Sequence, residues 1–595
     1  MPENSQIRYL ITTADENTWK FDRPVVFLGR WCLRYDRKNI WSAMDAVIAE
    51  AYGFGKLRKD ENFNLARNIE ARLFDQVYPI LNNFHQMSCS GRFWRVILGH
   101  WLRRYVEIML NRVCTLQECL SNFEINGTTI YSLDEYELAT VDSHTAIWAC
   151  NDDRWNNALY ARILVLLGKQ EIIKEKISDT SINCYTSPEV AAKDSIKKKI
   201  RHLVYKFIVF FLSIFRKDSD GLIINSYLSR KENIKLFLKL KQVPQFTSSP
   251  SFTTNAEANH KLRKEFSSKI LLDNSSDLEK IVSTLVFELM PICFLEGFQE
   301  VLNHVDKLRW PKKPGFIFTS NNFDTDELFK TWTAIQVEAG AKYIVGQHGN
   351  NYGTYRYMNP SIEEITSDKF LTWGWIDGLK QHTPAFIFKT AGSPERDRNV
   401  TGGLVLIEDM IYQRLDTWDR YEEFEGFFDE QIDFVKGLSP LVINNLTIRL
   451  HHTHRFLRSF EVMRWNDYDD QLNIDMGLRN INHLIDESRL VVFSYDSTGM
   501  LETLSRNIPT IAFWKNELDH LRESARPYYK LLADAEIVHF SPKSAAKKIN
   551  EIWQDVDSWW LSIEVQSARE QFCQRYARTS SSPSAELAKL LTSCP

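Results

Sequence analysis

The last third of the chain contains a polar turn that directly follows a strand-like run. The run LVVFS ends at Ser494, the turn occupies residues 495–499, and a helical pattern then begins with Glu502 in its first turns. Ligands of open parallel sheets bind beyond the carboxyl ends of the strands, and a helix N-terminus there offers N–H groups to a phosphate. Ser or Thr hydroxyls can add donors, although such residues also commonly cap helices. The candidate nucleotide ligands are Ser494, Ser497, Thr498, Gly499 and Glu502.

A second polar strand end lies upstream, in the segment LTIRLHHTHRF. Metal binding is one interpretation because histidine is a common zinc ligand, but no carboxylate or thiol stands nearby at a ligand spacing. Basic and donor groups that face a nucleotide phosphate explain the pattern better, and a packed or exposed histidine cluster is the remaining alternative. We predict Arg449, His451 and His454 as ligands of a nucleotide phosphate, and no metal site.

Two strand-like runs in the middle of the chain end in residues that can transfer protons. The run 315–319 leads to a turn with Asp324 and Asp326, and the run 342–345 ends at the sequence QHG. Histidine at a glycine-flanked strand end can act as acid or base, and aspartate can be a nucleophile or base in glycosyl chemistry. Helix capping is the alternative for the carboxylates. We predict catalytic roles for His348, Asp324 and Asp326, and ligand roles for Gln347 and Gly349.

Polar residues also follow the first strand-like run near the N-terminus, in the sequence TTADENTW. In an enzyme of two lobes this region would form the acceptor side of the cleft. Glu16 is the candidate general base there, and helix capping is the alternative interpretation.

The elements that must position these residues alternate between short buried strands and helical patterns. The last 200 residues follow βαβα order, which indicates a parallel doubly wound sheet. We expect an α/β protein with two Rossmann-like lobes and a large helical insertion in its N-terminal half. The expected units are an acceptor-side lobe with the insertion at 1–310, a central catalytic segment at 311–400, a nucleotide-sugar-binding lobe at 401–540, and C-terminal helices at 541–595.

Composition excludes several other classes of protein. The 595 residues include 73 Lys and Arg and 77 Asp and Glu, for a net charge of −4, which does not suit a general nucleic-acid binder. The 44% hydrophobic and 25% charged fractions are typical of a globular protein. The nine cysteines are widely spaced and form no CxxC pair, so we expect neither a disulfide framework nor a zinc knuckle.

Residues 196–217 form an unusual segment, in which a mostly apolar run is flanked by lysine and arginine. One interpretation is an interfacial helix on an anionic membrane surface, and the other is a core helix with exposed basic ends. The chain shows neither a signal-peptide pattern nor 18 consecutive apolar residues. We expect a cytoplasmic protein, with peripheral contact at the inner membrane face if the first interpretation holds.

Several motifs together resemble a family of bacterial transferases of surface-polysaccharide biosynthesis. They are LITTADENTW with VVFLGRWC, NDDRWNN, DELFKTW, QHGNNYG and SYDSTGMLETLSRNIPTIAFW, and they extend from about residue 8 to about residue 530. That family is in turn similar to the retaining β-Kdo glycosyltransferases of capsule and O-antigen assembly. Those enzymes have a GT-B arrangement of two Rossmann-like lobes and use CMP-activated 3-deoxy-ulosonic sugars.

The resemblance implies that the C-terminal lobe holds the nucleotide sugar and that the catalytic cleft contains His348 and an aspartate. In the β-Kdo enzymes an aspartate is thought to act as nucleophile, a role that the resemblance places on Asp324 or Asp326. The helical segment between residues 40 and 310 departs from a minimal GT-B lobe. The nucleotide-sugar ligands implied are Arg449, His451, Ser497, Thr498 and Glu502.

These patterns predict a glycosyltransferase that transfers Kdo or a nonulosonic acid from a CMP-activated donor to a glycan or lipid-linked glycan. The donor is a substrate, and no other cofactor is expected. One alternative is a GT-B transferase that uses a nucleotide-diphosphate sugar or a polyol-phosphate donor. Another is a noncatalytic protein of polysaccharide assembly.

Overall fold

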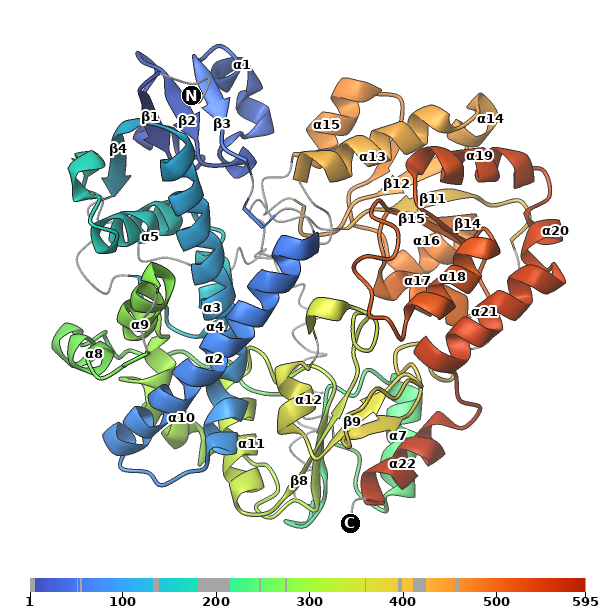
Figure 1. Cartoon of the computed structure of the whole chain (residues 1–595). Coiled ribbons are helices and arrows are strands. Elements are labelled where there is room, and N and C mark those ends of the chain that lie inside the picture. Colours follow the sequence, from blue (N-terminus) through green and yellow to red (C-terminus); the bar gives the residue numbers. More distant parts are fainter. Residues whose placement is uncertain are drawn as a thin grey trace, which may run out of the picture.

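The chain folds around three parallel β-sheets that surround a common centre (Figure 1). The computed structural model describes residues 6–50, 52–53, 56–131, 138–178, 215–245, 248–272, 276–358, 360–393, 399–409, 424–454 and 460–593. The first sheet has the strand order β3-β2-β1-β4-β5, the second β10-β9-β8-β7-β6, and the third β13-β12-β11-β14-β15-β16. Every registered pair of neighbouring strands in these sheets is parallel.

The strands are short and their central members are buried on both faces, as parallel strands covered by helices must be. In the first sheet they are β1 (Arg8–Ile11), β2 (Val25–Phe27), β3 (Ala46–Ile48), β4 (Ile125–Tyr131) and β5 (Ile173–Ile177). In the second they are β6 (Leu222–Ile224), β7 (Phe316–Thr319), β8 (Lys342–Gly346), β9 (Lys369–Thr372) and β10 (His382–Pro384). In the third they are β11 (Gly403–Ile407), β12 (Leu446–Arg449), β13 (Asn473–Asp475), β14 (Ser488–Phe493), β15 (Thr510–Phe513) and β16 (Val538–His539).

Helices connect and cover these sheets. In the first half of the chain they are α1 (Lys38–Trp41), α2 (Lys56–His85), α3 (Gly91–Asn122), α4 (Ser143–Ala149), α5 (Asp153–Leu166), α7 (Arg230–Lys239), α8 (His260–Ser267), α9 (Asp277–Leu289) and α10 (Phe298–Val305). In the second half they are α11 (Glu327–Glu338), α12 (Ile362–Thr366), α13 (Phe424–Gly437), α14 (Pro440–Ile443), α15 (Glu461–Tyr468), α16 (Ile481–Glu487), α17 (Thr498–Ser505), α18 (Arg526–Asp534), α19 (Pro542–Ile552), α20 (Val556–Trp560), α21 (Ile563–Tyr576) and α22 (Pro583–Thr592). Short 3-10 helices lie at Glu16–Thr18, Arg30–Cys32, Tyr35–Arg37, Gln170–Ile172, Ile292–Phe294 and Arg356–Met358.

The long helix α3 joins the first two sheets into one body. Ser90 caps it by accepting from the Phe93 N–H at 3.2 Å, and its buried face carries Trp94 and Trp101. The helix packs against α2 and α5 of the N-terminal part and against α11 and α12 beside the second sheet. A continuous core therefore extends from the first sheet through the second to one face of the third, while a smaller cluster fills the other face of the third sheet.

The end of the chain returns from the third sheet to the second. Helix α21 packs against α17 and α18 of the third sheet, and α22 then packs against α7 beside the second sheet. Figure 1 shows these red helices descending along one side of the molecule. The second and third sheets are thus joined twice, by the direct connection between β10 and β11 and by the C-terminal helices α21 and α22.

The predicted α/β class with Rossmann-like parallel sheets is confirmed, as is the doubly wound sheet in the last 200 residues. The N-terminal half differs from a lobe with a helical insertion because residues 40–310 also contain β3, β4, β5 and β6. Strand β6 pairs with β7, so the second sheet extends across the expected boundary at residue 310. The run 222–227 has the pattern of a buried strand, but local patterns do not show its partner, which follows about 90 residues later in the chain.

Residues 196–214, most of the expected interfacial segment, lie outside the described residues. Within the part of the chain that is described, no helix is long and apolar enough to cross a membrane.

Candidate active site

The loop after β8 carries the sequence Gln347-His348-Gly349, and the buried side chain of Gln347 fixes its shape. Its Nε2 donates to Gly349 O at 2.9 Å, and its Oε1 accepts from Trp373 N at 2.9 Å and from Trp375 Nε1 at 2.8 Å. The protein itself thus engages both ends of this amide. Gln347 has a structural function here, which is to hold the loop that presents His348.

His348 lies at the carboxyl end of the second sheet, where three successive strand ends meet. Its ring lies 6.4 Å from that of Tyr227, which follows β6, and 5.6 Å from that of Phe323, which follows β7. Burial lowers the pKa of His348 below its ordinary value, although the charges of Glu363 and Asp324 oppose this shift. The imidazole is therefore neutral at pH 7, which is the state that a general base requires.

The loop that carries His348 directly contacts the start of α17 in the third sheet. The backbone N–H of Asn350 donates to Thr498 Oγ1 at 2.8 Å, and Asn350 Nδ2 donates to Asp496 Oδ1 at 2.6 Å. A Cβ atom on Gly349 would lie 3.1 Å from Thr498 Oγ1, so glycine permits this close approach. The two motifs predicted independently from the sequence, QHG and SxxSTG, are thus adjacent in space.

The start of α17 has the form of an anion-binding helix N-terminus. Ser497 is the N-cap and accepts from the Met500 N–H at 3.1 Å, as the capping interpretation predicts. The first N–H groups of a helix have no intrahelical partner and carry partial positive charge. Gly499 is required beside Phe493, because a Cβ there would approach the Phe493 ring to 2.6 Å. Ser494, just before this turn, donates instead to Gln431 Oε1 at 3.1 Å.

Glu502, one turn into α17, faces the second sheet. Its Oε1 lies 2.8 Å from Lys389 Nζ. Burial raises the pKa of Tyr227, and the charge of Glu502 raises it further, so this carboxylate lies near the Tyr227 phenol beside His348. Glu502 is thus on the same side of α17 as the predicted catalytic histidine.

The two predicted carboxylates after β7 have different surroundings. Asp324 forms an ion pair with Arg104 of α3 at 3.0 Å. Asp326 caps α11 by accepting from the Phe329 N–H at 3.0 Å and also accepts from Asn322 Nδ2 at 2.7 Å. Asp326 therefore has the capping function that was the alternative interpretation, and Asp324 is a paired carboxylate whose charge acts on the pKa of His348.

The predicted basic cluster lies two strands away from α17, at the ends of β12 and β13. Arg449 Nη1 donates to Asp475 Oδ1 at 2.6 Å and to Arg479 O at 2.8 Å. His451 Nδ1 lies 2.8 Å from Thr453 Oγ1, and burial lowers the pKa of His451 to about 4. Arg449 is thus an internal ion-pair partner and His451 is uncharged at pH 7, which weakens the case for a phosphate clamp.

The remaining members of the predicted site are structurally engaged as well. His454 Nε2 lies 3.2 Å from Met476 O. Glu16, at the carboxyl end of β1 in the first sheet, is held by Arg37, whose Nε and Nη2 donate to the two carboxylate oxygens at 2.6 and 2.8 Å. The ligand and catalytic roles expected of these residues remain predictions.

Several residues of the site were missed by the sequence analysis. Asn350 and Tyr352 stand in the quoted motif QHGNNYG, whose polar residues after the glycine could have indicated them. Tyr227 has a backbone φ of 60°, the left-handed region that a bulky residue rarely adopts and that is often retained at functional sites. Glu363 accepts from the Tyr352 hydroxyl, and His100 lies 3.0 Å from Glu363. Neither residue has a local signal in the sequence, because each belongs to an ordinary helical pattern.

Within the described residues, no group of three or more His, Cys, Asp or Glu side chains is arranged to hold a metal ion. What the arrangement offers instead is a neutral imidazole at one strand end and a helix N-terminus close beside it. Such a pair can accept a proton from an attacking group and stabilise a negatively charged leaving group.

Comparison with known proteins gives one match over almost the whole chain. A model of the family described as LIC12162 family transferase matches residues 8–591. No curated protein matches the chain.

Solved structures show weak similarity at low identity. MurG of Acinetobacter baumannii is 9% identical over 63% of this chain and 99% of that one, with a TM-score of 0.31. The wall teichoic acid polymerase TagF is 11% identical over 66% and 96%, with a TM-score of 0.30. MnaA of S. aureus, solved with UDP, is 11% identical over 59% and 94%, with a TM-score of 0.31.

Proposed function

This chain belongs to the LIC12162 family of transferases, and we propose that it is a glycosyltransferase with a GT-B-like cleft between its second and third sheets. The observation that carries the proposal is the contact of the His348 loop with the start of α17, through the 2.8 Å hydrogen bond from Asn350 N to Thr498 Oγ1. It places a neutral imidazole beside a helix N-terminus. Glycosyl transfer from a nucleotide sugar can use the imidazole as a base for the acceptor hydroxyl and the helix N-terminus to stabilise the departing phosphate.

In the proposed reaction, His348 accepts the proton of the acceptor hydroxyl while the hydroxyl oxygen forms a bond to the anomeric carbon of the donor. The bond from that carbon to the phosphate oxygen breaks, and the nucleotide leaves with the electron pair. The N-terminus of α17 stabilises the growing negative charge, and this electrostatic contribution is commonly large in such reactions. Asp324 is the carboxylate positioned near His348, and the alternative of a double displacement would use it as nucleophile.

For the donor we propose a CMP-activated acidic sugar, Kdo or a nonulosonic acid, transferred to a surface glycan of the capsule or O-antigen type. This part of the proposal rests on the resemblance of motifs such as QHGNNYG and SYDSTGMLE to a family of surface-polysaccharide transferases, which is in turn similar to the β-Kdo enzymes. The alternative donors are a nucleotide-diphosphate sugar and a polyol phosphate.

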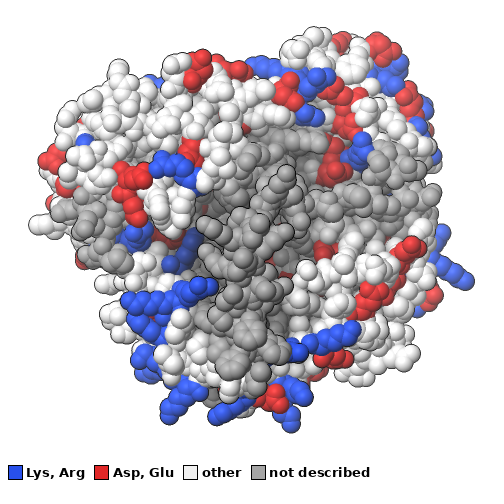
Figure 2. Space-filling model, turned by 180° about the vertical axis from the view of Figure 1, so that it is seen from behind, with Lys and Arg blue, Asp and Glu red and all other residues white. Residues whose placement is uncertain are grey.

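We further propose that the acceptor is lipid-linked and that the protein contacts the membrane surface peripherally. Exposed Arg230, Lys231 and Lys239 lie on α7 beside Leu238, which is 64% exposed. Figure 2 shows Lys and Arg side chains gathered along the lower rim, the end of the molecule that holds α7 and α22 in Figure 1. Basic residues around exposed apolar side chains suit an anionic bilayer surface.

The first test is nucleotide binding to the purified protein. It is measured as the change in Tm on thermal unfolding with CMP, UDP, GDP or ADP. A rise in Tm with CMP alone supports the CMP-sugar donor, whereas a rise with UDP or GDP alone keeps the glycosyltransferase and replaces its donor. The decisive variant is His348→Gln, assayed for transfer from CMP-Kdo to a glycan acceptor. If it keeps wild-type kcat, His348 is not the base and the proposed mechanism is wrong.

A further inference from the structure

A continuous chain of hydrogen bonds leads from His348 into the protein core. Tyr352 Oη lies 3.2 Å from His348 Nδ1 and also donates to Glu363 Oε1. The other oxygen of Glu363, Oε2, lies 3.0 Å from His100 Nε2. Three separate segments thus contribute to one path, namely the loop after β8, the first turn of α12 and the middle of α3.

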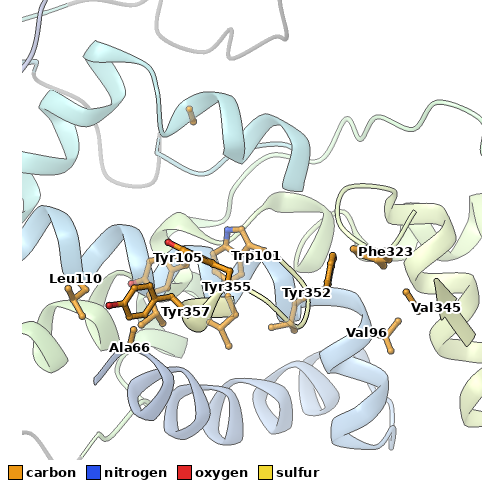
Figure 3. Close-up of a cluster of buried hydrophobic side chains, with 14 of the residues drawn as sticks. Ala66, Val96, Trp101, Tyr105, Leu110, Phe323, Val345, Tyr352, Tyr355 and Tyr357 are labelled. Carbon is orange, nitrogen blue, oxygen red and sulfur yellow. The ribbon is translucent and has the colours of Figure 1, made fainter. Parts of the chain in front are cut away.

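The central members of this chain cannot easily turn to other partners. Tyr352 and Glu363 are only 2% and 3% exposed. The Tyr352 ring packs 5.1 Å from the ring of Phe370, and Figure 3 shows it among core side chains that come from α3 and from the end of the second sheet. Buried groups in a close-packed interior keep their rotamers, so the direction of the phenol is fixed.

The number of available protons decides the direction of each hydrogen bond. Burial would raise the pKa of Glu363, but the hydrogen bonds and charge of His100 and the hydrogen bond from Tyr352 lower it to about 2, so Glu363 is an ionised acceptor at pH 7. A phenol carries a single proton, and Tyr352 donates it to Glu363. The Tyr352 oxygen can therefore only accept from His348, and the donor must be the Nδ1–H of His348.

This direction settles the state of the other ring nitrogen. A neutral imidazole has one N–H, so a proton on Nδ1 leaves Nε2 with a free lone pair. His348 Nε2 has no hydrogen-bond partner among the described residues. It is the nitrogen that remains available to an acceptor hydroxyl.

We propose that Tyr352, Glu363 and His100 are positioning residues that hold His348 in the Nδ1–H tautomer, with Nε2 as the basic nitrogen. The tautomer itself is a property of the free protein. The inference rests on the proposed function only where it assigns Nε2 the role of base toward the acceptor hydroxyl. His100 fixes the ionised carboxylate, the carboxylate orients the phenol, and the phenol orients the imidazole.

The tautomer can be measured by nitrogen NMR on the full-length protein labelled with ¹⁵N-histidine, with no substrate present. The His348 signals are those lost in His348→Gln. At neutral pH we expect Nδ1 to be protonated and Nε2 to be bare. In Tyr352→Phe, and also in Glu363→Gln, where the amide can donate to the phenol and reverse its direction, the Nε2–H tautomer should become populated.

Tyr105→Phe is the matched control. Tyr105 is also a buried tyrosine, but it lies on α3 and its hydroxyl donates to Val282 O at 2.6 Å, so it takes no part in the hydrogen bonds that lead to His348. It should lower stability as a lost buried hydrogen bond does but leave the His348 tautomer unchanged. Transfer from CMP-Kdo should show a loss of about tenfold or more in kcat for Tyr352→Phe at constant KM. Tyr105→Phe should keep the wild-type kcat.

The outcomes separate this inference from the proposed function. A protonated Nε2 in the wild-type protein, or a tautomer that Tyr352→Phe and Glu363→Gln leave unchanged in folded protein, overturns the inference even if His348→Gln is inactive. The expected tautomer together with full activity of His348→Gln overturns the proposed function, and with it the positioning role.

Discussion

The backbone N–H of Asn350 donates to Thr498 Oγ1 across 2.8 Å, although the two residues stand 148 positions apart in the chain. One belongs to the loop after β8 in the second sheet, and the other begins α17 in the third. This hydrogen bond is the point where the histidine loop and the helix N-terminus meet. Its removal should therefore affect both the stability of the contact and the binding of a nucleotide.

Thr498→Val replaces the hydroxyl with a methyl group of similar size and leaves the Asn350 N–H without its acceptor. We expect a loss of about 1–3 kcal/mol in the free energy of unfolding and weaker binding of the nucleotide that raises Tm in the wild-type protein. Denaturant unfolding and calorimetry measure the two effects. Thr592→Val is the control, since the Thr592 hydroxyl donates only to backbone carbonyls of its own helix α22, to Ala588 O at 2.9 Å and to Lys589 O at 3.4 Å. Unchanged nucleotide affinity in folded Thr498→Val would contradict a nucleotide site at α17.

The ion pair of Asp324 with Arg104 predicts a dependence of stability on pH. Burial alone would raise the pKa of Asp324, but the charges of Arg104 and His100 outweigh it and hold this pKa well below its ordinary value. The stabilisation is therefore complete above about pH 4, the unfolded pKa, and decreases as pH falls toward the lower pKa of the folded state.

Asp324→Asn should remove this pH-dependent contribution. Both side chains are about 30% exposed, so we expect a loss of about 1–3 kcal/mol at pH 7, between the values of surface and buried pairs. Urea unfolding between pH 3 and 7 measures it, and the difference from wild type should shrink at the acid end. Asp326→Asn is the control, because asparagine caps helices as well as aspartate does. A difference that stays constant over this pH range would contradict an electrostatic origin.

The sequence predicted the strands at the centre of each sheet because central parallel strands are continuous apolar runs, such as YLI in β1 and LVVF in β14. The edge strands β3 and β10 escaped detection, because β3 carries partly exposed residues and β10 contains a proline. Strands β4 and β5 of the first sheet also escaped detection, since they follow helical segments and find their partners only through tertiary packing. Such pairing has no local signature.

Strand-end motifs located His348 and Thr498 correctly at facing edges, because the carboxyl ends of parallel strands carry the ligands of such sheets. Polar residue types alone could not separate site residues from internally paired ones. In the sequence Arg449 has the pattern of a ligand and Glu16 that of a general base, yet each forms an ion pair within the protein. The partners of these charges, Asp475 and Arg37, are identified only by the folded structure.

Gln347 should matter for stability rather than only for ligand contact. Gln347→Leu would leave the Trp373 N–H and the Trp375 Nε1–H without their shared acceptor in the core, so we expect a loss of about 2–5 kcal/mol. Gln245→Leu is a matched control, because Gln245 is also buried and makes a single 3.2 Å hydrogen bond to Gly221 O. Denaturant unfolding measures both variants. Equal losses in the free energy of unfolding would show that the Gln347 hydrogen bonds stabilise the protein no more than the single Gln245 hydrogen bond does.

Glu16→Gln tests whether the first sheet supplies a general base. Arg37 donates to both carboxylate oxygens, and the pair is partly exposed, with the Arg37 side chain 41% and the Glu16 side chain 28% accessible. A pair of this kind contributes about 0.2–1 kcal/mol to stability. Because the carboxylate is already engaged, we expect kcat for transfer from CMP-Kdo to change by less than about threefold, whereas loss of a true general base costs about 10²- to 10⁴-fold. Arg37→Gln separates two roles of Glu16, because it frees the Glu16 carboxylate. If Glu16 is a general base that Arg37 blocks, kcat should rise in Arg37→Gln. If the pair is purely structural, both variants should lose the same stability and keep the wild-type kcat.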